Sequence, residues 1–244
     1  MTPGGAGSRP KGALHLVPNL LGAVAPERVL PARTIDAARA IERWIVETPK
    51  AARAFLKSIG HPRPIAALAI EALSERPTHA ELSALLAPAR EGHALGFVSD
   101  AGCPAIADPG ALLVAAAHAS GIAVVPLVGP SAILLALMAS GLSGQAFAFH
   151  GYLPVREEER AARLRELEAE SRARGCAQIF IETPYRNAAM LTTLATVLAP
   201  RTRVAVAVDL TLPTESVSMR PAVEWRRVDP STYQRRPAVF LVQA

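Results

Sequence analysis

A segment rich in aspartate, glycine and proline, residues 98–110 (VSDAGCPAIADPG), follows an apolar run and precedes a helix-forming one. Ligands in open α/β sheets bind beyond the carboxyl ends of strands, so this loop is a candidate binding site. Its glycines allow a ligand to approach the backbone, and its prolines stiffen it. Asp100 and Asp108 have no basic residue between them, which disfavours phosphate and favours a ligand with hydroxyl groups or positive charge. The alternative is a tight strand-to-helix connection in which Asp108 caps the helix.

A second loop, residues 126–132 (PLVGPSA), also follows an apolar run. Its strand is expected beside the first, so that the two loops would open side by side and form a cleft. Ordinary turn chemistry is the alternative. The chain contains no Gly-Lys-Ser or Gly-Lys-Thr, and no GxGxxG follows the first predicted strand, so two common phosphate-binding motifs are excluded.

The elements that would position these loops form a βαβ unit. Residues 94–99 and 122–127 are predicted as buried strands, with a helix over 111–120 between them and another over 131–141. Short apolar runs joined through a helix indicate a parallel sheet that is buried on both faces. The earlier part of the chain has five further predicted elements: strands over 13–18 and 65–72, and helices over 34–45, 51–59 and 78–89.

The second half of the chain has more strand signals. The predicted elements are strands over 147–152, 178–181, 204–210, 217–223 and 238–242, and helices over 155–174 and 188–198. The fold class predicted is α/β, with two α/β domains and mainly parallel sheets. We expect a disordered N-terminus over 1–12, an N-terminal domain over 13–130 and a C-terminal domain over 131–244, each of ordinary domain size.

Composition limits the function classes. Half of the 244 residues are hydrophobic, enough to bury a core. Residues 1–150 carry 12 basic and 10 acidic side chains and residues 151–244 carry 14 and 11, so the charge permits nucleic-acid binding without indicating it.

The uncharged run 109–155 is interrupted by glycine and proline and lacks ~20 unbroken apolar residues, so no membrane span is expected. With no secretory leader and two cysteines 73 residues apart, a cytoplasmic protein is predicted.

Three motifs in order, SDAGCPAIADPG at 99–110, PLVGPSA at 126–132 and GYLP at 151–154, resemble the tetrapyrrole-methylase superfamily of S-adenosylmethionine (SAM) methyltransferases. Within it, the chain is most similar to the branch that methylates a ribose 2′-hydroxyl of small-subunit ribosomal RNA (rRNA). Weaker likeness extends over LHLVP at 14–18, IFIETPYR at 179–186, VAVAVDLT at 204–211 and RRPAVFLV at 235–242. The resemblance implies two α/β domains with SAM in a cleft between them, and a homodimer.

The resemblance also implies which residues bind SAM. Ala101, Gly102, Cys103 and Ile106 would line the pocket from the first loop, and Pro18 would lie at its floor. Ser131 and Ala132 would contribute from the second loop. Three further positions match family contacts to the adenine and methionine parts of SAM: Ile181, Leu210 and Ala238.

The chain departs from the rRNA branch where that branch faces its acceptor. A TPIGN motif is replaced by residues 19–23 (NLLGA), an AEDTR-like motif by 46–50 (VETPK), and YESxHR by IETPYR. These changes indicate a divergent relative. The acceptor is therefore left open between an rRNA ribose and a tetrapyrrole-like small molecule, and loss of transfer, leaving a SAM-binding module, is a further alternative. Without the resemblance, an α/β enzyme acting on a sugar or nucleotide would be considered.

Methyl transfer from a sulfonium needs alignment more than acid–base catalysis, but a hydroxyl acceptor benefits from a general base. Asp100 is the preferred candidate and Glu47, in the altered AEDTR-like motif, a comparable one; Glu182 and Asp209 also end predicted strands. Each has a structural alternative as a cap, hydrogen-bond partner or surface charge. Tyr185 and Arg186 could contact an RNA base or phosphate, or form a solvated loop. No pair of histidines has metal-ligand spacing, so no metal is expected.

Overall fold

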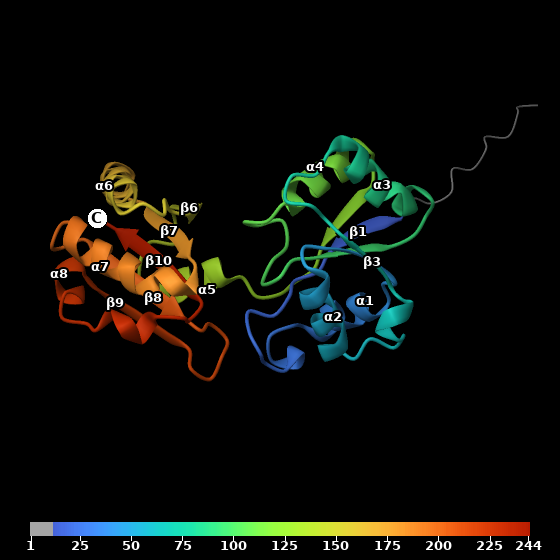
Figure 1. The fold of residues 1–244 in the computed structure, drawn as a ribbon, viewed down its shortest axis with the longest axis horizontal. Helices are drawn as coiled ribbons and strands as arrows, with labels where there is room; N and C mark the ends of the chain where they lie inside the picture. Colours follow the sequence, from blue (N-terminus) through green and yellow to red (C-terminus); the bar gives the residue numbers. More distant parts are fainter. Residues whose placement is uncertain (1–11) are drawn as a thin grey trace, which may run out of the picture. The chain divides into compact units, whose positions relative to one another are not determined.

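The computed structural model describes residues 12–244 (Figure 1). The chain divides into two compact units, one ending at Pro130 and the other comprising Ser131–Ala244. The disorder predicted over 1–12 lies outside the described residues except at Gly12, whose N–H donates to the Ala89 carbonyl at 2.8 Å.

The first unit is built on a five-stranded sheet in the order β3-β2-β4-β1-β5, and every neighbouring pair is parallel. Its strands are β1 (Ala13–Leu16), β2 (Arg43–Val46), β3 (Ala69–Ala72), β4 (Leu95–Val98) and β5 (Ala123–Pro126). Its helices are α1 (Ala32–Arg39), α2 (Pro49–Ser58), α3 (His79–Arg90) and α4 (Gly110–Ala119), with 3-10 turns η1 (Pro26–Arg28) and η2 (Ile65–Ala67).

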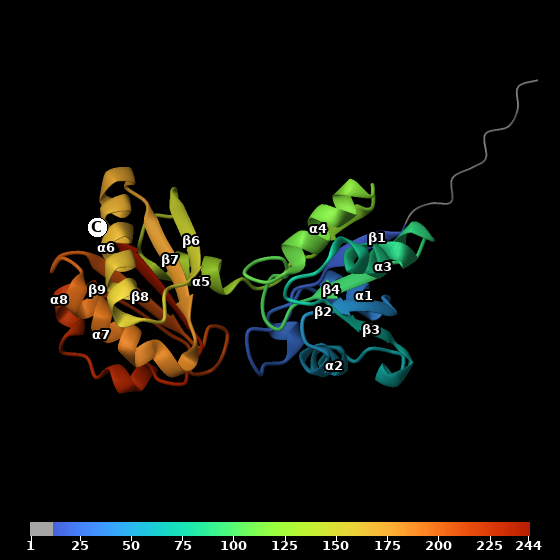
Figure 2. The ribbon, with the colours of Figure 1, turned by 45° about the horizontal axis from the view of Figure 1, so that its top comes forward.

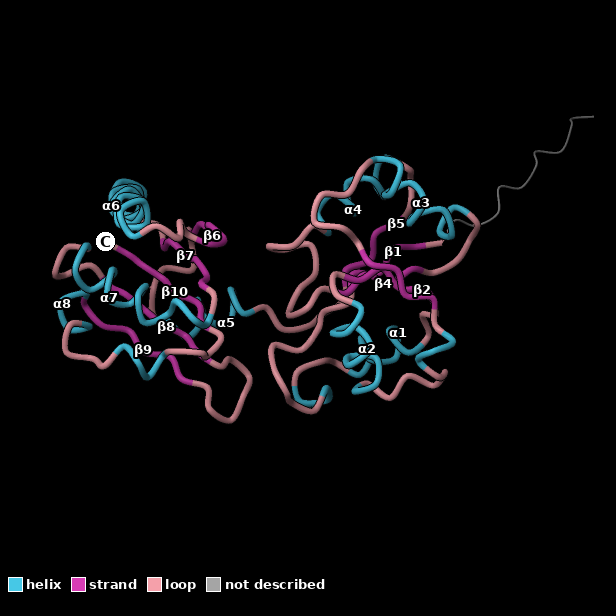
Figure 3. The backbone as a smooth tube through the Cα atoms, viewed as in Figure 1, coloured by secondary structure: helices cyan, strands magenta, loops and turns pink. Residues whose placement is uncertain are grey.

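Helices cover both faces of this sheet, α1 and α2 on one and α3 and α4 on the other (Figures 1 and 3). Side chains alternate along β2, so that Trp44 packs toward α1 and α2 while Ile45 packs toward α3 and α4. The indole of Trp44 also fixes the residue beside it in β4, because a Cβ on Gly96 would lie 2.6 Å from the ring. Burial on both faces explains why β2 and β4 are short apolar runs. The strand predicted to be buried over 122–127 is wrong in this respect, because β5 lies at the edge of the sheet with Ala123 and Pro126 exposed.

Two further predicted elements of this unit are wrong in part. The helix predicted over 34–45 ends at Arg39 as α1, and β2 occupies Arg43–Val46. Ile35, Ala38, Ile41 and Ile45 have helical spacing and all four are buried, but Ile45 packs on the opposite face of the sheet from the other three. The strand predicted over 65–72 begins with η2 after Pro64, and only Ala69–Ala72 pairs with β2.

The second unit has a mixed five-stranded sheet in the order β6-β7-β10-β8-β9. Its strands are β6 (Phe147–Tyr152), β7 (Ala177–Glu182), β8 (Arg203–Val208), β9 (Ser216–Pro221) and β10 (Ala238–Gln243). Only β6 and β7 are parallel, and the other three pairs are antiparallel. The predicted α/β class is confirmed for both units. The first sheet is parallel throughout, as predicted, whereas the second sheet has only one parallel pair and is mainly antiparallel.

Helices of the second unit are α5 (Ala132–Ser140), α6 (Glu157–Arg174), α7 (Asn187–Val197) and α8 (Ala222–Trp225), with 3-10 turns η3 (Pro184–Arg186) and η4 (Pro230–Tyr233). Figure 2 shows α6 and α7 lying side by side over the sheet. Their apolar side chains pack with Phe180 and Phe240, whose rings stack with centroids 5.8 Å apart. α6 ends at Gly175, which takes the left-handed conformation (φ 62°) that commonly closes a helix.

Candidate functional site

Four loops meet at one edge of the first sheet. The register aligns Val46 with Val98, and Leu16 with both Phe97 and Pro126, so β2, β4, β1 and β5 end together. The segments that follow are 47–48, 99–109, 17–25 and 127–131. This is the carboxyl edge of a parallel sheet, the position in which open α/β sheets bind ligands.

The loop after β4 has an unusual and well-braced backbone. Gly102, Ala105 and Ala107 have positive φ values of 67°, 67° and 64°. The Asp108 carboxylate accepts hydrogen bonds from the N–H of Ala105 at 2.9 Å and from that of Gly110, the first residue of α4, at 2.7 Å. Burial raises the pKa of this carboxyl, and the backbone donors oppose the rise. Asp108 therefore holds the loop and the start of α4, which is the structural alternative considered for it.

Glu47 and Asp100, the two preferred candidates for a base, lie together. The Oε2 atom of Glu47 accepts a hydrogen bond from the Asp100 N–H at 2.8 Å, and the Thr48 hydroxyl donates to Oδ2 of Asp100 at 2.8 Å. Burial, followed by repulsion from Asp100 and Asp108, raises the pKa of Glu47, and the bond from the Asp100 N–H opposes this rise. Among the described residues, none donates to the second oxygen of Glu47, and no cation pairs with either side chain.

Asn19 was not recognised from the sequence, yet it joins two loops of the edge. It is 6% exposed, and its Nδ2 donates to the carbonyls of Ser99 and Asp100 at 2.9 and 3.0 Å. Its Oδ1 accepts from the Leu20 N–H at 2.8 Å. The sequence feature that could have indicated Asn19 is a polar side chain directly after the first predicted strand. The partners of Asn19 in the other loop are about 80 residues away in the chain, so the sequence identifies them only if the pairing of the strands is known.

The loop after β5 lies against the loops after β1 and β4. A Cβ on Gly129 would lie 2.3 Å from the Pro18 Cβ, and one on Gly102 would lie 3.1 Å from Leu21. The Cys103 thiol points at the Pro130 carbonyl at 3.4 Å, and burial raises its pKa, which favours the thiol over the thiolate. The structure thus brings Pro18, Gly102 and Cys103 together.

The other residues predicted from the first loop are open to solvent. Ala101 is exposed and the Ile106 side chain is 49% exposed. Ser131 caps the start of α5, where its hydroxyl accepts from the Leu134 N–H at 3.4 Å, and Ala132 is the first residue of that helix. Ala101 and Ile106 are therefore placed where a ligand could reach them without displacing the core.

The residues predicted from the second unit share an edge of the second sheet. Ala238, the first residue of β10, pairs with Glu182 at the end of β7 and with Val208 at the end of β8. Ile181 precedes Glu182, and Leu210 follows β8 by two residues, so Ile181, Leu210 and Ala238 come together. Their contact with SAM stays a prediction.

Both carboxylates at this second edge are paired with arginine. Oε1 of Glu182 accepts from Nε and Nη2 of Arg186 at 2.8 and 2.5 Å, and Asp209 accepts from Nε of Arg236 at 2.8 Å. The other oxygen of Glu182, Oε2, is buried without a partner among the described residues. Pairing of this kind holds a carboxylate in a fixed position through charge-assisted hydrogen bonds. Glu182 and Asp209 therefore fit the structural alternatives better than the role of a base.

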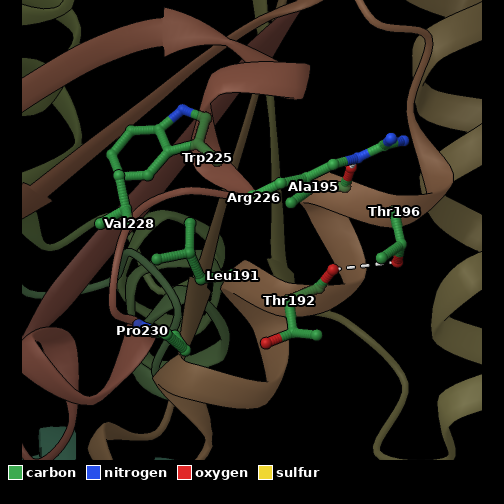
Figure 4. Close-up of a pocket in the computed structure, with 8 residues that line it drawn as sticks. All are labelled: Leu191, Thr192, Ala195, Thr196, Trp225, Arg226, Val228 and Pro230. Carbon is green, nitrogen blue, oxygen red and sulfur yellow. Dashed lines mark hydrogen bonds between the residues drawn. The ribbon is translucent and has the colours of Figure 1, made fainter.

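A separate hollow of about 180 Å³ lies beside α7 (Figure 4). Trp225 borders it and donates its indole N–H to the Val204 carbonyl at 3.1 Å, at the amino end of β8 and hence away from the edge with Ala238. The Thr192 hydroxyl donates to the Ala188 carbonyl, and Nε of Arg226 donates to that of Ala195. The hollow contains none of the residues predicted to bind SAM.

Among residues 12–244, no group of three or more His, Cys, Asp or Glu side chains is arranged to hold a metal ion. No helix in the same range has the length and hydropathy needed to cross a bilayer.

Solved structures with the same fold include two methyltransferases. The methyltransferase CobJ aligns over 95% of this chain and 94% of its own, with a TM-score of 0.62 and 21% identity. A cobalt precorrin-4 methyltransferase, CbiF, aligns over the same shares with a TM-score of 0.60 and 13% identity. These likenesses establish the two-domain fold.

The sequence comparisons identify the family as well as the fold. Residues 29–222 match the model of the tetrapyrrole (corrin/porphyrin) methylases. A Xylella fastidiosa protein named ribosomal RNA small subunit methyltransferase I is 38% identical over 84% of this chain and 71% of its own length. Its Escherichia coli O157:H7 namesake is 32% identical over 88% of this chain and 71% of its own length. The chain belongs to the tetrapyrrole methylase family, and it is a methyltransferase that uses S-adenosylmethionine.

Proposed function

We propose that this enzyme transfers the methyl group of SAM to a ribose 2′-hydroxyl of small-subunit rRNA. The observation that carries the proposal is the 38% identity, over 84% of the chain, to a relative named for methylation of small-subunit rRNA. The pair formed by Glu47 and Asp100 supports a hydroxyl acceptor, because such an acceptor must lose a proton during transfer.

The residues of the first edge fit SAM. This ligand carries a sulfonium, an ammonium and ribose hydroxyls, and the loop after β4 presents carboxylate and backbone with no cationic side chain. Gly102 and Gly129 let Leu21 and Pro18 approach the loop backbone more closely than a Cβ would allow, which holds the loops of this edge together. Pro18, Ala101, Cys103 and Ile106 would form the wall, Ser131 and Ala132 would add to it from the start of α5, and Ile181, Leu210 and Ala238 from the second unit. When bound, SAM supplies a methyl group already activated for in-line displacement.

Glu47 is the general base of this proposal. Its raised pKa makes it a stronger proton acceptor than an ordinary carboxylate, and its Oε1 remains available. The Asp100 N–H, bonded to Oε2, fixes the direction of the carboxylate. Asp100 in turn is held by the Thr48 hydroxyl, and its exposed carboxylate can accept a hydrogen bond from a ribose hydroxyl or attract positive charge.

The test uses purified enzyme, SAM labelled in its methyl group, and 30S subunits from a strain deleted for the gene. We expect label in the rRNA, at a 2′-O-methylated nucleotide identified by nuclease digestion and mass spectrometry. The small-molecule fraction of the same cells is assayed in parallel. Label only in that fraction would replace the rRNA acceptor by a small molecule, and SAM binding without label anywhere would leave a SAM-binding module.

We propose in addition that the enzyme acts in the cytoplasm as a homodimer. The acceptor supports the location, since ribosomal subunits are cytoplasmic in bacteria. The family resemblance supports the dimer, as do Phe147 and Tyr152, which are 43% and 57% exposed on the edge strand β6. Light scattering coupled to gel filtration measures the mass directly, and a monomer at micromolar concentration would exclude the dimer.

A further inference from the structure

Two segments at the second sheet edge are held together by five hydrogen bonds. The Arg235 N–H donates to the Pro184 carbonyl at 2.8 Å, and Nδ2 of Asn187 donates to the carbonyls of Tyr233 and Arg236. Gln234 completes the set, since its Nε2 donates to the Tyr185 carbonyl and its Oε1 accepts from the Ala188 N–H. Residues 184–188 and 233–237 therefore form one braced surface.

This surface presents an aromatic ring beside a cation. The Tyr185 side chain is 72% exposed, and Tyr185 and Arg235 line a hollow of about 450 Å³ together with Pro184 and Pro237. Arg235 has a φ of 60°, a conformation that non-glycine residues rarely adopt and that concentrates at functional sites. We call the hollow and these four residues the Tyr185 platform.

Arg235 is the unneutralised cation here. Its neighbours Arg186 and Arg236 are paired with Glu182 and Asp209. No acidic side chain pairs with Arg235, and no acceptor bonds to its guanidinium, among residues 12–244. The sequence had suggested Tyr185 with Arg186 as an RNA contact. The structure instead leaves Arg235 as the arginine able to meet an external anion.

The Tyr185 platform adjoins the edge that is predicted to contact SAM. The Pro237 carbonyl accepts from the Asp209 N–H at 3.0 Å, and the next residue, Ala238, pairs with Glu182. Ile181 and Ala238 therefore lie within a few residues of Pro184 and Pro237 in the chain. A nucleotide held on the platform would lie beside the residues of this unit that are predicted to contact SAM.

We infer that the Tyr185 platform binds an unpaired nucleotide of the rRNA acceptor, with its base stacked on the Tyr185 ring and its phosphate on Arg235. This inference rests on the proposed function. An exposed ring beside a free cation is how proteins hold single-stranded RNA, whereas paired bases present no free face for stacking. The platform selects an unpaired segment and does not specify its sequence.

The direct test measures binding of a fluorescein-labelled 12-nucleotide single-stranded RNA to the full chain by anisotropy. Tyr185→Leu, which keeps apolar bulk without a ring, should weaken binding about 10-fold, while Tyr185→Phe should bind like the unaltered protein. Arg235→Ala should lower the slope of log Kd against log salt by about 0.7, the loss of one phosphate contact. Arg201→Ala, an exposed arginine at the amino end of β8, removes the same charge and should leave affinity nearly unchanged.

Calorimetric SAM binding should be the same in all four variants, which checks that each one is folded. Equal RNA affinity in Tyr185→Leu and the unaltered protein would overturn the inference, as would an equal loss in Arg201→Ala. Preferential, Tyr185-dependent binding of the porphyrin carboxylate uroporphyrin would also overturn it, in favour of a small-molecule platform.

Methyl transfer to 30S subunits separates this inference from the proposed function. If the unaltered enzyme labels rRNA while Tyr185→Leu and Arg235→Ala label it with unchanged KM, the proposed function stands and the platform fails. If the unaltered enzyme labels no rRNA, the proposed function fails, and the RNA-binding measurement still decides whether the platform binds RNA.

Discussion

The two sheet edges both place carboxylates just beyond a strand, but they treat them differently. At the first edge, Glu47 and Asp100 accept from a backbone N–H and a threonine hydroxyl, with no cation paired to them among the described residues. At the second, Glu182 and Asp209 each bind an arginine. The carboxylates of the first edge are therefore available to react with or bind a ligand, whereas those of the second edge stabilise the local structure.

Electrostatics explains why this matters. At the second edge the arginines occupy one oxygen of each carboxylate, Oε1 of Glu182 and Oδ2 of Asp209, and hold it in place with charge-assisted hydrogen bonds. Glu47 is partly buried beside two other carboxyl groups, which raises its pKa and leaves it more able to accept a proton. The first edge is thus suited to proton transfer and to a cationic ligand, and the second to a rigid loop surface.

The largest expected effect is on catalysis at the first edge. Glu47→Gln keeps an acceptor for the Asp100 N–H but cannot take a proton, so kcat for methyl transfer should fall about 100-fold or more. SAM affinity measured by calorimetry should change little. Glu71→Gln, at an exposed carboxylate on β3, is the matched control. A Glu47→Gln enzyme with near-normal kcat would remove the proposed base.

The corresponding change at the second edge should affect stability. Glu182→Gln leaves Arg186 without its anion at a site where the Glu182 side chain is fully buried and that of Arg186 is 28% exposed. We expect the free energy of unfolding in urea to fall by about 2 kcal/mol, with kcat retained at low temperature. Glu224→Gln, on the exposed side of α8, should cost under about 0.5 kcal/mol. Loss of kcat without loss of stability would reverse the comparison between the edges.

A smaller effect is expected where the loops of the first edge touch. In Gly129→Ala the new methyl would lie 2.3 Å from the Pro18 Cβ, so the two loops must separate, at a cost of about 1–2 kcal/mol. SAM binding should weaken about 10-fold if Pro18 forms the floor of its pocket. Gly144→Ala, where no atom lies within 4 Å of the new Cβ, should bind SAM normally. Unchanged affinity in Gly129→Ala would place SAM elsewhere.

The smallest effect is a pH dependence of stability. Because the pKa of Glu47 is raised above its ordinary value of 4.5, the folded state holds this proton over a range in which the unfolded state has lost it. Stability from this group therefore falls as pH rises from about 4.5 through the raised pKa. Glu47→Gln should show a shallower fall in urea titrations over this range. A steeper fall in the variant would contradict the direction assigned to this pKa.

The parts of the fold that the sequence predicted are those with local signals. Apolar runs bounded by glycine and proline mark the positions of β4, β5, α4 and α5. The start of α3 is marked by its capping residue, Thr78. β2 was missed because its four residues continue the helical spacing of α1, and burial on both faces removes the alternation that marks a strand. β10 was predicted as a strand over 238–242, but its antiparallel pairing was not, since apolar patterning carries no information about strand direction.

The candidate site shows the same limit. The loops of the first edge were predicted because glycine, proline and aspartate concentrate there in a recognisable order. Asn19 and the pairing of Arg186 with Glu182 were missed, and so was the free guanidinium of Arg235. Each depends on which segments the sheets bring together, and the partners of Asn19 lie 80 residues from it in the chain. The type of a residue indicates which chemistry it can perform, but the pairing of the strands determines which side chains and carbonyls lie next to it.

The place of β10 in its sheet has a consequence for synthesis on the ribosome. β10 lies at the centre of the second sheet, between β7 and β8, although it follows both in the chain. Until it is translated, β7, which pairs with β6, and β8, which pairs with β9, each expose an unpaired hydrogen-bonding edge on the other side, a known hazard for aggregation. The first sheet, complete at Pro126, can form earlier. A pause in translation before β10 would therefore leave one finished unit attached to one that depends on chaperones.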